Sequence, residues 1–260
     1  MSSLPPTREP FPSIAPAAVE VDANEIRASI VAIDRAEDDA EVIGLMMRAA
    51  WAMGANAAVF TAFTHDDAIF TSYRSLHACD PEWPSLYASH RWAAEDPWLD
   101  YARRHSAPTL ATQVAVHEER PRAIVEAAAV HGFASAVIVP APSPHGPSQV
   151  GVLCVGSTTA GHFEELGFAS IRPLLRGLAM ELHDWCHRSM RKELSTRAHL
   201  TDDDLHLLRH EAAGHGSKEI ARALHTRPIT IDCRFQRLNN RLGVANRRDA
   251  VRLARLYELI

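Results

Sequence analysis

Residues 217–242 read SKEIARALHTRPITIDCRFQRLNNRL, and this stretch decides the fold of the C-terminal part of the chain. A short segment with helical periodicity leads to a proline-marked turn, and a longer amphipathic segment follows. In that second segment the apolar side chains fall at spacings of four, three and four, at Ile231, Phe235, Leu238 and Leu242. These spacings put all four on one face of an α-helix, which must pack on a core. The stretch therefore predicts two helices joined by a tight turn.

The opposite face of the second helix carries a different set of side chains. They are Cys233, Gln236 and Asn240, flanked by Asp232, Arg234, Arg237 and Arg241. Amide side chains can hydrogen-bond to base edges, and arginines can bind phosphates. For this helix alone, a solvated basic face is an equally good interpretation. The preceding short helix and turn favour a reader of the DNA major groove.

Capping signals extend this pattern to four short helices. Thr201 and Asp204 have the spacing of a capping box at the start of the first helix, and Ser217 is expected to cap the second. Asn246 begins a similar pattern before the fourth helix. Residues 197–260 are therefore predicted to form a small all-α helix-turn-helix domain.

The charge distribution separates this tail from the rest of the chain. The whole chain has a formal net charge of −5. Residues 196–260 contain 12 Lys and Arg against 8 Asp and Glu, a net of +4, whereas residues 1–195 carry a net of −9. A basic tail on an acidic body favours a polyanionic partner for the tail alone.

The tail resembles the LuxR-type helix-turn-helix over about sixty residues. The matching positions are Leu200–Thr201, Ala212–Gly214, Lys218–Ala221, Leu224, Thr230–Ile231, Arg234, Leu238, Leu242–Val244, Asn246–Arg248 and Ala250–Val251. The resemblance implies binding to double-stranded DNA and adds Lys218 and Thr230 to the DNA-contacting residues named above. It departs at His215 and Gly216, where the family often has Lys-Ser, and at Arg227, where a serine usually caps the helix.

Upstream of the tail, helical and strand-like segments alternate. The first 18 residues hold five of the 16 prolines and are predicted to be a disordered leader. Helical patterns cover 24–51, 120–131 and 163–190, and β-like runs cover 57–63, 68–73, 133–140 and 149–156. This order predicts an α+β sensor domain at 19–187, with helices packed on an antiparallel sheet. The polar residues 188–196 are predicted to be a linker.

An aromatic segment is the most informative part of this upstream region. Trp83, Tyr87, Trp92 and Trp98 lie within sixteen residues, with Asp96 among them. One interpretation is an apolar pocket with a single polar anchor. The alternative is an aromatic core in which the aspartate only caps a helix.

The segment is similar to the autoinducer-binding domain of quorum-sensing LuxR regulators, in which W-x3-Y is followed nine residues later by Asp-Pro. Here Tyr87 and Asp96 are nine residues apart. The resemblance implies that Asp96 accepts a hydrogen bond from the amide of an acyl-homoserine lactone. It also implies that Trp83 and Tyr87 form walls of the pocket with Trp98 beside them. Cys154 stands where the family often has Ser or Thr, and Cys79 near a frequent Tyr.

Two positions depart from this sensor pattern. Ala111 stands where the family usually has a tryptophan whose indole N–H holds the lactone carbonyl, and Ala136 replaces a glycine. A lost hydrogen bond to a buried carbonyl costs about 1–3 kcal/mol, which is enough to change ligand preference. The expected ligand is therefore a homoserine lactone or a non-lactone signal. A hydroxyl at Thr109 or Thr112 is one conceivable substitute for the missing donor.

Several other classes of protein fit poorly. The motifs of nucleotide-binding and hydrolytic enzymes are missing from the sequence, which argues against an enzyme and against a cofactor. The 15 histidines are scattered without metal-ligand spacing, so no metal site is expected. The region before the tail has one lysine, Lys192, and a phospho-receiver needs a lysine within its fold. The four separated cysteines, the absence of a signal peptide and the absence of a long apolar run favour a cytoplasmic protein without membrane contact.

We therefore predict a ligand-responsive bacterial transcriptional regulator of the LuxR type that acts as a homodimer. A ligand-independent or protein-controlled DNA-binding regulator with a vestigial pocket is the alternative. One apolar stripe has two equal interpretations, as a dimer or interdomain contact and as sensor core. It consists of Ile171, Leu174, Leu178, Leu182 and Trp185.

Overall fold

A computed structural model describes residues 21–66, 70–143 and 149–260. The predicted leader at 1–18 lies outside the described residues. Among those described, no helix is both long enough and apolar enough to cross a bilayer.

The N-terminal domain is built on one five-stranded antiparallel sheet. Its strands are β1 (Ala57–Asp66), β2 (Phe70–Ala78), β3 (Thr109–Leu110), β4 (Ser135–Pro142) and β5 (Gln149–Ser157). They lie in the order β2-β1-β5-β4-β3, and every neighbouring pair is antiparallel. The predicted α+β class with an antiparallel sheet is confirmed. The second predicted strand was too short, because β2 continues to Ala78 rather than ending at Tyr73.

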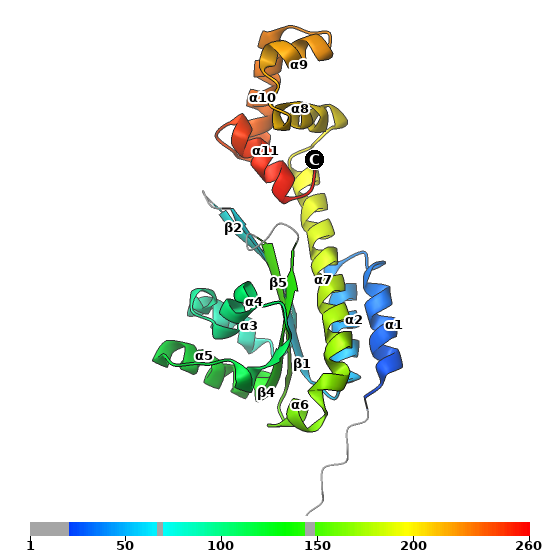
Figure 1. Cartoon of the computed structure of the whole chain (residues 1–260), viewed down its shortest axis with the longest axis vertical. Helices are drawn as coiled ribbons and strands as arrows, with labels where there is room; N and C mark the ends of the chain where they lie inside the picture. The colour runs from blue at the N-terminus through cyan, green and yellow to red at the C-terminus, as the bar shows by residue number, and fades with distance from the viewer. Residues whose placement is uncertain (1–20, 67–69, 144–148) are drawn as a thin grey trace, which may run out of the picture.

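Helices cover both faces of this sheet (Figure 1). One face carries α1 (Ala23–Ile33), α2 (Asp39–Trp51) and α7 (Phe168–Arg197). The other carries α3 (Glu82–Ser89), α4 (Pro97–Arg104) and α5 (Glu119–Ala128). Shorter helical turns lie at Trp92–Ala94, Ala111–Gln113, Ala129–Phe133 and α6 (His162–Glu165). Because strand side chains alternate between faces, β1, β4 and β5 each contribute to two separate cores.

Helix α7 joins the two halves of the molecule. The single helix predicted at 163–190 is interrupted at Gly167, which has φ +80°. Helix α7 then runs without a break to Arg197, so the predicted linker at 188–196 is helical. Its polar composition was misleading because Met190 and Leu194, four residues apart, are buried and give the segment one apolar face.

The apolar stripe on α7 belongs to the sensor core. Ile171, Leu178, Leu182 and Trp185 are all buried within the chain, and Leu174 packs against the same core. The Trp185 indole also donates a hydrogen bond to the Ala36 carbonyl at 2.8 Å. The burial of these residues within one chain agrees with the interpretation of the stripe as sensor core.

The tail consists of α8 (Asp202–Ala212), α9 (Ser217–Ala223), α10 (Pro228–Leu242) and α11 (Arg247–Leu256). The predicted capping box of Thr201 and Asp204 is present. Gly216, rather than Ser217, is the N-cap of α9, because the Ser217 hydroxyl donates to the Asp232 carboxylate at 2.6 Å. The four helices close around the predicted apolar stripe of α10.

Candidate functional site

A cavity of about 600 Å³ lies between the sheet and the segment from α3 to α4. Its volume is within the range of pockets that hold small molecules. The sheet contributes Val59, Thr61 and Phe63 of β1, Tyr73, Ser75 and His77 of β2, and Val152 and Cys154 of β5. The opposite wall includes Trp83, Tyr87, Arg91, Asp96, Trp98 and Leu99. Most of the predicted ligand-binding residues therefore share one cavity.

Asp96 both caps α4 and lines this cavity, and it is 7% exposed. Its Oδ1 accepts hydrogen bonds from the backbone N–H groups of Trp98 at 2.8 Å and Leu99 at 3.4 Å. Its Oδ2 accepts the Tyr87 hydroxyl at 2.7 Å. An ionised carboxylate has about four acceptor positions. One position on Oδ2 is thus open to a donor. Asp96 caps α4 as one interpretation expected, and its role as a ligand anchor stays a prediction.

Burial sets the protonation of the groups around Asp96. Burial raises the pKa of Asp96, and the hydrogen bonds from Tyr87 and the α4 backbone offset part of that effect. Burial, followed by the nearby Asp96 charge, raises the pKa of Tyr87. The phenol is therefore a hydrogen-bond donor at neutral pH, which suits the support of a carboxylate.

Aromatic rings form the wall next to Asp96. The Trp83 ring centroid lies 5.6 Å from that of Tyr87 and 6.1 Å from that of Phe133. Trp98 packs on the other side of Phe133, also at 6.1 Å. The Trp98 indole N–H is buried and has no hydrogen-bond partner among the described residues. This wall therefore presents aromatic ring faces and one hydrogen-bond donor without a described partner, the Trp98 indole N–H.

Cys154 and Cys79 have different surroundings. Cys154 lies on β5, lines the cavity and is 9% exposed. Cys79 follows β2 and does not line the cavity; its thiol lies 3.7 Å from the Asp80 carbonyl oxygen. Burial, followed by the charge of Asp80, raises the pKa of the Cys79 thiol to about 12. Cys79 packs against the core cluster that contains Trp83 and Cys154 but lies outside the cavity lining, and its contact with ligand stays a prediction.

The segment around Ala111 also lies outside the cavity lining. Ala111 begins a short 3-10 helix. Thr109 donates to the Gln113 side chain at 3.0 Å, and Thr112 donates to the Glu164 carboxylate at 3.1 Å. Neither threonine hydroxyl replaces the missing indole donor.

The outward face of α10 presents part of the predicted DNA-contacting set. Cys233, Gln236, Arg237 and Asn240 are exposed, and so is Lys218 on α9. Thr230 and Arg234 are half-buried at the edges of the same face. Amide and guanidinium groups are therefore available on one surface.

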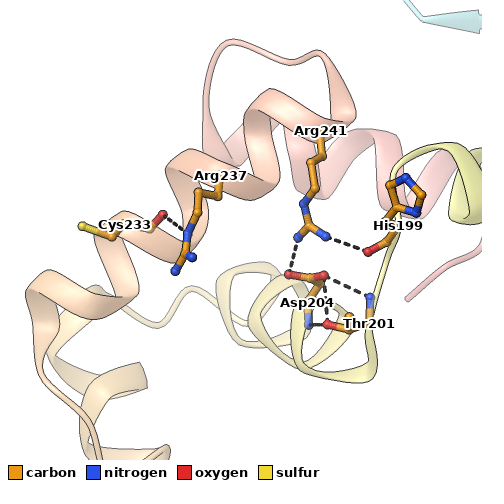
Figure 2. Close-up of polar contacts among 6 residues, drawn as sticks. All are labelled: His199, Thr201, Asp204, Cys233, Arg237 and Arg241. Carbon is orange, nitrogen blue, oxygen red and sulfur yellow. Dashed lines mark hydrogen bonds and ion pairs between the residues drawn. The ribbon is translucent and has the colours of Figure 1, made fainter.

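Arg241 and Asp232 bind instead to neighbouring helices of the tail. Arg241 donates to the Asp204 carboxylate at 2.7 Å and to the His199 carbonyl at 2.6 Å (Figure 2). Burial alone would raise the pKa of Asp204, but Arg241 and Thr201 hold it below the ordinary value. The Asp232 carboxylate accepts Arg247 at 2.5 Å as well as Ser217. The two predicted DNA contacts are thus engaged in fixing α10 against α8, α9 and α11.

Two family models cover almost all of the described chain. The model of the autoinducer binding domain matches residues 38–185. The model of bacterial regulatory proteins of the luxR family matches residues 198–254. The chain belongs to the LuxR family. It is a ligand-responsive transcription regulator with an autoinducer-binding domain and a helix-turn-helix domain.

Solved structures of LuxR-family proteins share this fold. Escherichia coli SdiA has 17% sequence identity and a TM-score of 0.70, covering 91% of this chain and 98% of its own. SdiA in complex with octanoyl-rac-glycerol has 18% identity and a TM-score of 0.64, covering 90% and 94%. CepR2 of Burkholderia cenocepacia, an N-acylhomoserine lactone dependent factor, has 17% identity and a TM-score of 0.53, covering 64% and 95%. No curated protein matches significantly in sequence.

The cavity residues that the sequence analysis did not predict include Thr61, Ser75, His77 and Arg91. Ser75 and His77 lie on the part of β2 beyond the predicted strand end. Alternation from Tyr73 would have placed both on the cavity face if the strand had been extended. Arg91 has a left-handed backbone with φ 54°, which no sequence signal marks.

Proposed function

We propose that this LuxR-family regulator binds a small amphiphile through Asp96 and couples its occupancy to DNA binding by α10. The open acceptor position on Asp96 Oδ2 carries the proposal, because a buried carboxylate with one free position selects a ligand N–H or O–H group. Structurally similar proteins bind or depend on amphiphiles, namely octanoyl-rac-glycerol for SdiA and an acylhomoserine lactone for CepR2.

The body of the ligand lies against Trp83, Tyr87 and Trp98 in this proposal, with Cys154 beside its polar head. Aromatic walls favour flat or apolar groups. Because Ala111 offers no side-chain donor and stands outside the cavity lining, we expect common homoserine lactones to bind weakly. A ligand whose head is satisfied by Asp96 alone, such as a glycerol hydroxyl, fits better.

We propose that the polar residues of the tail have three different roles: contact with base edges, contact with the DNA backbone, and positioning of α10. Cys233, Gln236 and Asn240 face base edges, whereas Lys218, Thr230, Arg234 and Arg237 face the backbone of double-stranded DNA. Arg241 and Asp232 position α10 without touching DNA. Two copies of the chain form a homodimer on two-fold operators, since such tails read paired half-sites.

The remaining assignments follow from this role. The sensing domain comprises residues 19–187 and the DNA-binding domain residues 197–260, joined by the last turns of α7. The protein acts in the bacterial cytoplasm, where DNA is its partner, and it regulates transcription rather than catalysing a reaction.

The carboxylate is tested with Asp96→Asn and with the matched control Asp100→Asn, which changes a half-buried carboxylate of α4 outside the cavity lining. Calorimetry measures the binding of octanoyl-rac-glycerol and of N-octanoyl homoserine lactone. A hydrogen bond to a charged group contributes about 1.5–3 kcal/mol, or about 10- to 150-fold in affinity. We expect Asp96→Asn to lose that factor for the glycerol ester and the control to bind normally. Equal affinity in all three proteins would reduce Asp96 to a helix cap and favour a vestigial pocket.

The DNA surface is tested by comparing two arginines one helical turn apart. The probes are a duplex selected from a random pool by the wild-type protein and a scrambled duplex. Arg237→Ala should weaken binding to both and lower the salt-dependence slope by about one unit, with thermal stability unchanged. Arg241→Ala should lower the melting temperature, because it leaves the Asp204 carboxylate without its cation. Wild-type binding by Arg237→Ala at every salt concentration would remove that residue from the interface.

A further inference from the structure

The cavity has a second polar wall, opposite Asp96, on the edge strand β2. Tyr73, Ser75 and His77 alternate along β2 and all line the cavity. Ser75 pairs across the sheet with Thr61 of β1, which lines the same cavity. We call Thr61, Ser75 and His77 the polar stripe.

The members of the polar stripe bond to one another. The Thr61 and Ser75 hydroxyl oxygens are 2.8 Å apart, and Ser75 Oγ lies 2.9 Å from His77 Nε2. Thr61 and His77 each make this one hydrogen bond among the described residues. Desolvation lowers the pKa of His77, so its ring is neutral at pH 7. Lone pairs on Thr61 and the Nδ1 atom of His77 thus remain open.

The polar stripe and Asp96 stand at opposite sides of the cavity. Helix α4, which Asp96 caps, packs on β4 and β5. Strand β1 lies between β5 and β2. Neighbouring strands are about 4.8 Å apart, so β2, which carries Ser75 and His77, is about 10 Å from β5, whose Cys154 lies near Asp96. The side chains between the two polar walls are apolar, and they include Val59, Phe63 and Val152.

A positive charge also lines the cavity. Arg91 is exposed, and no described residue forms an ion pair or hydrogen bond with its guanidinium. A cation in the same cavity as hydroxyl and imidazole groups favours a ligand oxygen. An entirely apolar ligand tail would leave these polar groups without partners when it displaced water from them.

We propose that the ligand has two polar ends, a donor that binds Asp96 and a hydroxyl group about 10 Å away that joins the polar stripe. This inference rests on the proposed function, because it places the ligand in the same cavity. The ligand class is then an amphiphile with an oxygenated tail. The polar stripe, rather than Asp96, determines which tail is preferred.

The test uses N-butyloctanamide and N-butyl-8-hydroxyoctanamide on the full-length protein. Both offer an amide N–H to Asp96, and an extended eight-carbon chain with bonds of about 1.5 Å reaches the polar stripe. One added neutral hydrogen bond corresponds to a gain of about two- to tenfold in affinity. We therefore expect the hydroxylated amide to bind about fivefold more tightly by calorimetry.

The double variant Thr61→Val/Ser75→Ala is expected to reduce this preference, since the hydroxyl then keeps only the His77 ring as a partner. Ser85→Ala, an exposed change on α3 outside the cavity lining, is the control and should keep the wild-type preference. Circular dichroism shows whether each variant is folded, and Ser75→Ala alone, with a smaller expected reduction, replaces the double variant if the latter is not.

The outcomes separate this inference from the proposed function. The two amides could bind wild type with equal affinity and both fail to bind Asp96→Asn. That result would contradict the contact between the ligand hydroxyl and the polar stripe, but it would leave the Asp96 site supported. An unchanged preference in the double variant would also contradict that contact. If neither amide binds the wild-type protein, the inference of a second polar end is wrong. The proposed function is then tested separately, by the binding of octanoyl-rac-glycerol to wild type and to Asp96→Asn.

Discussion

The two faces of the sheet differ in how completely they are filled. On the face toward α7, Phe60 of β1 and Leu153 of β5 are fully buried in a continuous apolar core. On the other face, their neighbours Thr61 and Val152 line the cavity. The same strands supply both faces, so alternation determines which residues share a face. The sizes of the side chains, and the distance at which α3 and α4 stand from the sheet, determine whether that face is packed or hollow.

Buried titratable groups distinguish the faces further. On the packed face, burial and then the neighbouring His187 lower the pKa of His183 to about 4. On the hollow face, burial raises the pKa of Asp96. Both environments favour the neutral form. Asp96, however, has hydrogen-bond donors that support its charge, whereas the Nδ1 of His183 has no described hydrogen-bond partner.

The largest expected difference between the faces comes from two phenylalanines of β1. Phe60→Ala should destabilise the protein by about 3–5 kcal/mol, because it opens a void in a packed core. Phe63→Ala, on the cavity wall, should cost less than about 2 kcal/mol, since its ring already borders empty space. Urea unfolding of both variants measures this. Equal losses would mean that the cavity wall is as tightly packed as the core.

Acid should lower the free energy of unfolding of the protein through His183, which lies on the packed face. The unfolded chain takes up this proton near pH 6.5, the folded protein only near pH 4, so stability is lost as the pH falls between these values. The linked loss approaches about 3 kcal/mol. Urea midpoints at pH 7 and pH 4.5 should therefore differ less in His183→Leu than in wild type. A parallel decline in the two proteins would assign the acid sensitivity to other groups.

Adding side-chain volume should reduce stability much more at Gly151 than at its neighbour Val152, because these adjacent residues of β5 face the packed core and the cavity respectively. A Cβ at Gly151 would lie 2.7 Å from His183 Nδ1 and 2.8 Å from Phe60 Cζ. Gly151→Ala should therefore cost about 1–3 kcal/mol through overpacking. Val152→Leu extends into the cavity and should change stability by less than about 1 kcal/mol while weakening ligand binding. Thermal melts with and without octanoyl-rac-glycerol compare them, and a large loss in Val152→Leu would contradict the contrast.

The smallest expected effect is the contribution of Asp96 to the pH dependence of stability in the protein without ligand. Its folded pKa is raised, so the folded state takes up a proton before the unfolded chain does as the pH falls from neutrality toward the ordinary value of 3.8. This contribution is stabilising at low pH and is lost as the pH rises. It is opposite in sign to that of His183. Asp96→Asn should therefore show a steeper acid decline than wild type, and a shallower one would exclude a raised pKa.

The tail could be predicted further than the sensor domain. The α10 stripe, the Thr201 cap and the exposed side chains of α10 follow from periodicity and local capping. The bonding of Arg241 within the tail was not predicted, because its partner, Asp204, is 37 residues away and lies on another helix. Sequence spacing reports which face a residue occupies but not whether a neighbouring element has already engaged it.

In the sensor domain, Asp96 was found through one compact aromatic segment. The polar stripe was not, because Thr61 and Ser75 meet only through strand pairing across the sheet. Nothing in the sequence indicates the hollow between α3 and the sheet, since a cavity depends on what several distant segments fail to fill. The helical connection at 188–196 was missed because composition outweighed the spacing of two buried residues.

The uninterrupted course of α7 has a mechanical consequence. A helix of 30 residues is about 45 Å long, and its first two thirds, from Ile171 to Met190, are packed in the sensor core. A tilt of the whole helix by about 5° about its N-terminal end moves the far end by about 4 Å, which exceeds the 3.4 Å rise between successive base pairs. Because the helix continues into the tail, repacking of the core around its C-terminal part is transmitted to the tail with no flexible joint to absorb it.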